Sequence, residues 1–230
     1  MEKVILLCLA NSKKLAERCV AGIDVRTGEW VRPVSRIGKQ GAVPFRERQI
    51  DSAEPQLMDL IEMDLAYEGP TGFEYCHARE NRWIEPTPWR RIGRAKPADI
   101  ERYCCTEEIL LHSWAKFTRP EVIEAKPLAQ RHTLELRRVK QLQVHPDGNQ
   151  WRCSFVTPPG IVATDLPVTD LDLLGLLNAG KPFVARGYAV VSLGVPYAAP
   201  KPGWDQGEVG WKLLAAWIPD SIPGLEHNQR

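Results

Sequence analysis

The sequence lacks a hydrophobic run long enough to span a membrane. The apolar run near its start covers only residues 4–10, whereas a membrane-spanning helix needs about 20 apolar residues. No clear small-residue cleavage site follows this run, as it would in a secretory signal peptide. We therefore expect a buried first strand at 4–10, no membrane partner and a cytoplasmic protein.

Motifs for metal, cofactor or nucleotide hydrolysis are also missing. No Cys-x-x-Cys pair occurs among the six cysteines, although most zinc knuckles need that spacing. The chain has neither a G-x-x-x-x-G-K-[ST] phosphate loop nor a G-x-G-x-x-G run. Its histidines are scattered, and no nucleophile signature is recognisable. The sequence thus predicts reduced, mostly structural thiols, no metal, no cofactor and no catalytic residue.

Charge of one sign is not in excess, because 30 Lys and Arg stand against 29 Asp and Glu. Attraction to nucleic acid must therefore come from local patches rather than from net charge. The 19 prolines and 17 glycines exclude a long coiled coil and, with eight tryptophans, favour β-structure. The 230 residues fit one large domain or two small ones.

The first 78 residues predict five strands. Turn residues separate runs of alternating or continuous apolar residues, and Gly28 suits a tight hairpin because glycine readily adopts a positive φ. The segment that follows, 79–125, is rich in proline and predicts irregular structure with short helices at 98–104 and 107–117. The five strands are expected at 4–10, 18–25, 29–34, 57–67 and 73–78.

The last hundred residues predict three strands, a helix and two further strands, which is the element order of an OB-fold. The first of these strands carries an interruption near Arg137 and Arg138. The fold class expected is mostly β, with two OB-fold-like barrels and a short helical connector. The expected boundaries are a first barrel with a basic Trp-containing loop at 1–96, a connector at 97–125, a second barrel at 126–222 and a tail at 223–230. The elements of the second barrel are strands at 133–144, 151–155 and 161–163, a helix at 169–178, and strands at 183–193 and 211–218.

Three runs near the start and two near the end resemble the dual OB-containing domain family. They are Leu7–Lys14, Arg18–Asp24, Thr27–Ser35, Val191–Gly194 and Trp211–Ile218. The resemblance implies two OB-like barrels in one compact prokaryotic module that recognises nucleic acid or nucleotides, often beside immunity or conflict-system genes. It supplies no catalytic residue. The sequence departs from the family at 15–17, where a glycine-containing turn is more usual.

Candidate binding residues fall into three groups. On one strand, alternation places Trp30 and Arg32 on the same face. The ring and the guanidinium could bind a ligand there, or they could equally well pack in the barrel. Lysines and an arginine between the first two strands occupy a loop that OB-folds use for ligands. A basic stretch with interleaved tryptophans could bind a single strand or cover the seam between the barrels. The residues of the last two groups are Lys13, Lys14 and Arg18, and Trp83, Trp89, Arg90, Arg91 and Arg94.

The sequence predicts a non-catalytic module that binds single-stranded nucleic acid or a nucleotide-like ligand and that has a possible protein partner in a prokaryotic defence system. A protein-interaction scaffold is the first alternative, because fold does not fix function. An enzyme acting on nucleic acid through Asp59, Glu62 and Asp64 is a second alternative, although such strand carboxylates usually face solvent. We also expect the two barrels to unfold together, with the tryptophan-rich middle section packed between them.

Overall fold

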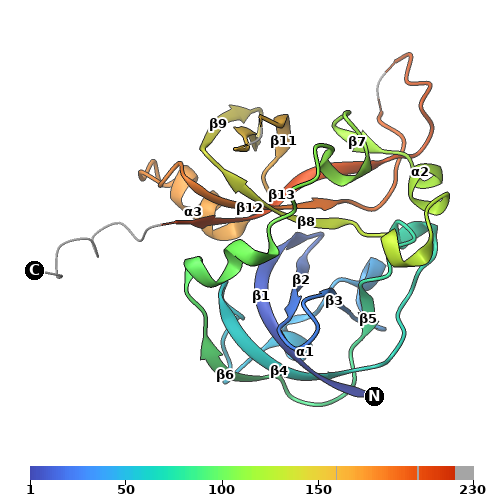
Figure 1. Ribbon diagram of the computed structural model, residues 1–230, viewed down its shortest axis with the longest axis vertical. Coiled ribbons are helices and arrows are strands. Elements are labelled where there is room, and N and C mark those ends of the chain that lie inside the picture. Colours follow the sequence, from blue (N-terminus) through green and yellow to red (C-terminus); the bar gives the residue numbers. More distant parts are fainter. Residues whose placement is uncertain (159, 201, 221–230) are drawn as a thin grey trace, which may run out of the picture.

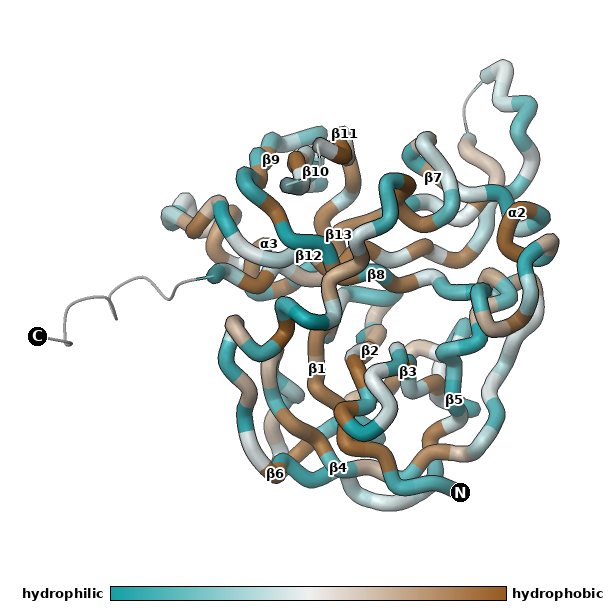
Figure 2. Tube along the Cα trace, viewed as in Figure 1, coloured by the Kyte–Doolittle hydropathy of each residue, from teal (hydrophilic) through white to brown (hydrophobic). Residues whose placement is uncertain are grey.

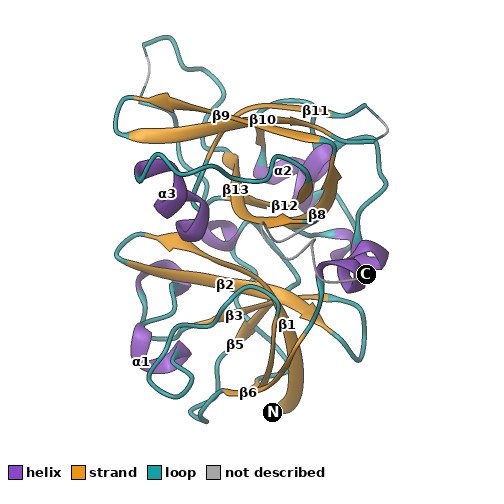
Figure 3. Cartoon of the chain, turned by 90° about the vertical axis from the view of Figure 1, so that its left-hand side faces the viewer, coloured by secondary structure: helices purple, strands orange, loops and turns teal. Residues whose placement is uncertain are grey.

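The structure is a computed structural model that describes residues 1–158, 160–200 and 202–220. The described chain forms two lobes of strongly curved β-sheet, one above the other, joined by short helices and loops (Figure 1). A view turned by 90° shows the same stacking, with the C-terminal lobe above (Figure 3). The expected mostly β fold is confirmed.

The N-terminal lobe is built on one six-stranded sheet in the order β5-β3-β2-β1-β4-β6. Its hairpin between β2 and β3 turns at Gly28, whose φ of +76° confirms the predicted left-handed position. The strands are β1 (Glu2–Lys14), β2 (Glu17–Asp24), β3 (Trp30–Val34), β4 (Asp59–Leu65), β5 (Asn81–Trp83) and β6 (Arg90–Arg94), and α1 (Phe45–Arg48) and the 3-10 turn η1 (Lys39–Gly41) lie in the loop before β4.

The strand β1 is buried on both faces, which explains its nearly continuous hydrophobic sequence. Val4, Leu6 and Cys8 face the interior of the N-terminal lobe, whereas Leu7 and Leu9 face the C-terminal lobe. Figure 2 shows this hydrophobic strand running along the middle of the N-terminal lobe. The prediction of a buried first strand is therefore confirmed, and the strand extends beyond residue 10 to Lys14.

The expected strand at 73–78 is wrong. Residues Phe73–Tyr75 form the 3-10 turn η2, and the next two residues have left-handed φ values of 55° and 53°, which an extended strand cannot contain. The sheet instead gains β5 and β6 from the segment expected to be irregular. β5 pairs with β3 in parallel, so that Asn81 lies opposite Arg32.

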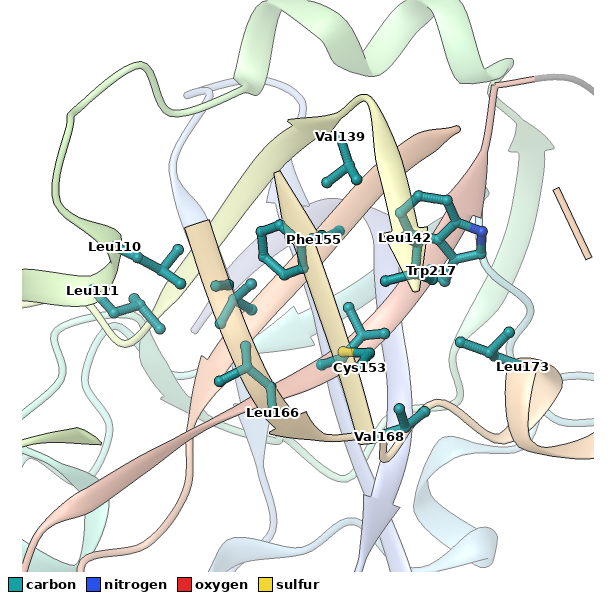
Figure 4. Close-up of a cluster of buried hydrophobic side chains, with 14 of the residues drawn as sticks. Leu110, Leu111, Val139, Leu142, Cys153, Phe155, Leu166, Val168, Leu173 and Trp217 are labelled. Atoms are coloured by element: carbon teal, nitrogen blue, oxygen red, sulfur yellow. The ribbon is translucent and has the colours of Figure 1, made fainter. Parts of the chain in front are cut away.

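The C-terminal lobe contains a four-stranded sheet, β7-β13-β12-β8, and a three-stranded sheet, β11-β10-β9, that close around one core. Figure 4 shows Phe155, Leu142 and Trp217 meeting in this core. Four strands rather than three precede the helix and the last two strands, because the first predicted strand divides at Lys140 and not at Arg137 and Arg138. The elements are β8 (Leu134–Val139), β9 (Gln141–Asp147), β10 (Gln150–Val156), β11 (Val162–Pro167), α3 (Leu171–Asn178), β12 (Gly187–Leu193) and β13 (Gly210–Pro219).

Asp170 fixes the start of α3 and ties it to β13. Its carboxylate accepts hydrogen bonds from the backbone N–H groups of Asp172 and Leu173, as an N-cap residue does. It also accepts one from Trp217, at 2.5 Å. The predicted helix at 169–178 therefore begins two residues later than expected, because Thr169 pairs with Leu214 and Asp170 is the cap.

The segment between the lobes is mostly irregular. The short helix expected at 98–104 forms as a 3-10 helix, whereas the one expected at 107–117 is reduced to a single 3-10 turn. Arg137 of β8 fastens this segment by donating to the carbonyls of Cys105 and Ile109, and it pairs with Glu135 at 2.6 Å. The elements are η3 (Pro97–Tyr103), η4 (Leu110–His112), β7 (Phe117–Thr118), α2 (Pro120–Glu124) and η5 (Leu128–Gln130).

The two lobes meet through an aliphatic cluster, the shared core, rather than through tryptophans. It combines Leu7, Leu9 and Ile23 of the first lobe with Leu136 and Val190 of the second, among others. The expectation that the tryptophans of the middle section pack between the barrels is wrong, because Trp89 is buried within the N-terminal lobe. The predicted tail at 223–230 lies outside the described residues.

Candidate functional site: a cleft between the two barrels

A cleft of about 460 Å³ opens where the end of the β1–β2 hairpin meets β12 and the start of β13. We call it the interbarrel cleft. Its floor includes Arg32 and Asn81 from the first lobe and Ser192 from the second, its aromatic wall is Tyr75, Tyr197 and Trp211, and its rim includes Lys13 and Leu15. A cavity of this size falls within the range of about 300–1,000 Å³ that small-molecule sites occupy.

Arg32 lies at the floor of the cleft and is 8% exposed. Its Nη1 donates to Asn81 at 3.3 Å, and its Nη2 donates to Thr133 at 2.9 Å and to Ser192 at 3.2 Å. Glu80 lies 3.9 Å from Nη2, away from the cleft lining, and accepts two hydrogen bonds from Thr133. Asp24 and Glu29, the carboxylates on either side of the turn before β3, pair with Arg26 and Arg79 and not with Arg32.

The Nε–H of Arg32 has no hydrogen-bond partner among the described residues. Buried donors are normally satisfied, so this N–H is available to donate to a ligand or a water. Trp211, on the aromatic wall, has an indole N–H in the same condition. Orphaned donors also occur elsewhere, as at Trp89, but these two border the same cleft.

Lys14, at the end of β1, lines the same cleft and is half-buried. Within the described part of the chain, its ammonium makes neither a hydrogen bond nor an ion pair. Burial and the nearby positive charge of Arg32 lower the pKa of Lys14 below its usual range. A cation held in this way gains from an anionic ligand, which would supply the charge partner that the protein does not.

The turn that carries Lys14 is strained. Leu15 has a φ of 56°, in the left-handed region that favours glycine. This is the position at which the sequence departs from the glycine-containing turn usual in the family it resembles. A residue in the left-handed conformation therefore occupies this turn although it is not a glycine. This residue, Leu15, lies on the rim of the cleft.

An aromatic cluster forms the wall of the cleft on the C-terminal side. Tyr197 is half exposed, and its ring lies 5.9 Å from that of Trp211 at a tilt of 36°. Trp211 is supported from behind by Trp204 and Phe117, at 5.3 and 5.4 Å. Such rings offer a flat, rigid surface on which a planar heterocycle can stack.

The cleft also contains thiols, but the chemistry of one of them is blocked. Cys76 donates to the carbonyl of Gly194 at 3.1 Å, and burial raises its pKa to about 12. A thiol at that pKa stays protonated at neutral pH and is a poor nucleophile. Cys76 is therefore poorly suited to act as a nucleophile in this cleft.

Two further predicted residues lie outside the cleft. Arg18 lines a separate polar cavity of about 150 Å³ beside Glu54. Trp30 packs against the shared core, whereas Val31, on the opposite face of β3, packs inside the first lobe. The predicted common face of Trp30 and Arg32 is thus confirmed, since both point toward the second lobe.

The residues of the basic Trp-containing loop lie in different environments in the structure. Trp89 is 3% exposed and packs in the core of the first lobe, so its ring is not available for stacking on a base. Trp83 is half-buried, and the guanidinium of Arg36 covers its ring at 4.7 Å. The arginines of β6 remain exposed on an edge strand but face carboxylates of β4: Arg90 pairs with Glu62, and Arg91 and Arg94 both pair with Asp59 at 3.0 Å.

These pairings bear on the carboxylate alternative. Asp59 is fully buried beneath Arg91 and Arg94, and the hydrogen bond from Arg90 lowers the pKa of Glu62. Among the described residues, no three Asp, Glu, His or Cys side chains are placed to hold a metal ion.

No helix of the described chain is long and apolar enough to cross a membrane.

Sequence reasoning found Lys13, Lys14 and Arg32 but missed the C-terminal half of the cleft. Ser192 is a polar residue in the otherwise largely apolar, buried strand β12, and Trp211 is the second residue of β13. Both belong to segments that resemble the family, so those segments carried the available signal. Tyr197, in the loop between β12 and β13, has no sequence signal of its own.

A family model described as Dual OB-containing domain matches residues 4–217. Among solved structures, the chain is similar to a murine DNA binding protein bound with double-stranded DNA, at 7% identity over 93% of each chain with a TM-score of 0.29. A similarity that low carries no argument about fold or ligand. No curated protein matches the chain. Because the family match extends over nearly the whole sequence, the resemblance is confirmed, and the chain belongs to the dual OB-containing domain family.

Proposed function

We propose that this protein is a non-catalytic recognition module for nucleic acid or a nucleotide-like ligand and that its binding site is the interbarrel cleft. The observation that carries the proposal is the Lys14 ammonium, which has no ion-pair partner among the described residues and lines the same cleft as the guanidinium of Arg32 and the rings of Tyr197 and Trp211. Cations that pair with phosphate and rings that stack on bases are the two components of a single-strand site.

The arginines of β6 are the weaker candidate. Each is already paired with a carboxylate of β4, so a phosphate would have to displace Glu62 or compete with Asp59. Within the described chain Lys14 makes no ion pair with a carboxylate, although Glu74 also lines the cleft, and the nearest carboxylate to Arg32, Glu80, lies at 3.9 Å. We therefore propose Lys13, Lys14 and Arg32 as the nucleic-acid-binding cations, with Arg90, Arg91 and Arg94 as structural partners of β4. A cytoplasmic sensing role in a prokaryotic defence system, as the family resemblance implied, is part of this proposal.

Lys14→Gln is expected to weaken binding of single-stranded oligonucleotides by about 10- to 100-fold, because a charge-assisted contact contributes about 1.5–3 kcal/mol. The slope of log K against log salt should flatten by about 0.7, the value for one lost phosphate contact on a single strand. The measurement is fluorescence anisotropy with labelled single- and double-stranded DNA and RNA at several salt concentrations.

The matched controls are Arg18→Gln, which removes one charge from the same hairpin outside the cleft, and the triple variant Arg90→Gln, Arg91→Gln, Arg94→Gln. Both should bind as the parent protein does once the folded fraction is taken into account, since the triple variant leaves the buried Asp59 without its two cations. If the triple variant flattens the salt slope while Lys14→Gln does not, the site lies on β6 and the cleft is excluded. If no oligonucleotide binds at any salt concentration, the protein-interaction alternative takes precedence.

Binding should also fall at alkaline pH, because an anionic ligand needs the protonated form of Lys14. Its pKa in the free protein is lowered, so affinity is full below that pKa and falls as pH rises through it, before the 10.5 of an ordinary lysine. Lys14→Arg should flatten this fall. Titrations in a Cys19→Ala background remove the neighbouring thiol from the comparison. An affinity that is constant up to pH 10 would contradict a role for the Lys14 ammonium.

A further inference from the structure

The interbarrel cleft has a buried cationic floor, and its aromatic wall reaches the solvent at Tyr197. Arg32 is more than nine-tenths buried and is surrounded by Asn81, Thr133 and Ser192, all of them buried as well. The aromatic side chain nearest to solvent, Tyr197, is half exposed. A ligand that enters therefore meets the rings at the mouth and the guanidinium at the closed end.

A closed floor constrains where the ligand carries its charge. An internal phosphodiester continues into a sugar on both sides, and a strand that placed such a group against Arg32 would have to pass through the Arg32–Thr133–Ser192 network. Only a phosphate at the end of a ligand can reach a closed floor. The volume of 460 Å³ fits one small ligand rather than the groove of several nucleotides that strand-binding OB-folds present.

We propose that the interbarrel cleft recognises a terminal phosphate monoester, either of a free mononucleotide or of a phosphorylated strand end. The phosphate lies at Arg32 and Lys14, and the base lies against Tyr197 and Trp211. This inference rests on the proposed function and specifies its ligand as an end rather than the interior of a strand.

The charge of the ligand gives the inference a distinctive readout. A phosphate monoester gains its second negative charge with a pKa near 6, whereas a phosphodiester carries one charge throughout the neutral range. The charged side chains that line the cleft are Lys13, Lys14, Arg32 and Glu74, and the other titratable ones are thiols and phenols. Histidine, the residue type that ordinarily titrates between pH 5 and 8, is absent from this lining in the described chain.

The experiment is isothermal titration calorimetry of the full chain with nucleoside 5′-monophosphates and nucleosides, and with short oligonucleotides that carry a 5′-phosphate, a 3′-phosphate or only hydroxyl ends. Monophosphates should bind at least tenfold more tightly than nucleosides. An oligonucleotide with a terminal phosphate should bind more tightly than its hydroxyl counterpart, and the better of the two phosphorylated ends identifies the polarity. Affinity for the monophosphate should rise between pH 5 and 7.

Two variants separate the parts of the cleft. Lys14→Gln should remove most of the preference for phosphate and the rise in affinity with pH. Tyr197→Ala should weaken nucleoside and nucleotide by a similar factor and leave the phosphate preference intact. Thermal unfolding of each variant verifies that the fold persists, which is expected because Lys14 is half-buried and Tyr197 is half exposed.

Two results would overturn the inference in distinguishable ways. If oligonucleotides bind equally with and without a terminal phosphate while monophosphates do not bind, the proposed function stands and recognition of an end is wrong. If neither mononucleotides nor oligonucleotides bind at all, the inference and the proposed function fail together.

Discussion

Replacing Arg32 with methionine is expected to lower the free energy of unfolding by about 3–5 kcal/mol, the cost of removing one partner from a buried ion pair. The substitution leaves the carboxylate of Glu80, which is 3% exposed, without its cation. It also deprives Thr133 and Ser192 of a hydrogen-bond donor. Urea denaturation followed by tryptophan fluorescence measures the change.

Glu80→Gln in the Arg32→Met background is the informative companion. Glutamine can still accept from Thr133 but carries no charge, so the double variant should regain part of the lost stability. Arg32→Lys should fall between the parent and Arg32→Met, because an ammonium retains the charge but not the fork of donors. A loss below 1 kcal/mol in Arg32→Met would contradict the role of this network in joining the lobes.

Trp89→Ala should cost a similar amount of stability, about 3–5 kcal/mol, because it empties a large buried site. The ring packs with Val4, Leu6 and Ile61 in the core of the first lobe. Urea denaturation followed by tryptophan fluorescence also measures this loss in the free energy of unfolding. Trp83→Ala is the control, since Trp83 is half-buried and should lose less.

The ligand affinity of Trp89→Ala should equal that of the parent once the folded fraction is taken into account. If the Trp89→Ala protein is stable but has lost oligonucleotide binding, the ring of Trp89 belongs to the binding surface instead.

The elements that could be predicted from the sequence are those with local causes. Gly28 adopts a positive φ in a short hairpin, and β1 is a long apolar run with polar residues on both sides. Asp170 caps α3, which begins two residues after the expected start of the helix. The strand wrongly predicted at 73–78 also has apolar residues in near alternation. The prediction fails because the chain turns there through two consecutive left-handed residues, which no local pattern reveals.

The site was only half predictable, because its geometry depends on partners far away in the sequence. Arg32 bonds residues that are 49, 101 and 160 positions further along the chain, so its burial could not be foreseen from the alternation within β3. Exposed Arg90 and buried Trp89 are neighbours in the sequence with opposite environments. A basic run with tryptophans is therefore compatible with an edge strand anchored by one core ring.

The shared core imposes an order on biosynthesis. Leu7 and Leu9 are translated about two hundred residues before Val190, Ala215 and Ile218, which cover them. At about 5–20 residues per second, the apolar outer face of the nascent first lobe stays uncovered for roughly 10–40 s. During that interval the growing chain presents a surface suited to holdase chaperones, and premature termination before β12 would leave the hydrophobic face permanently exposed to aggregation.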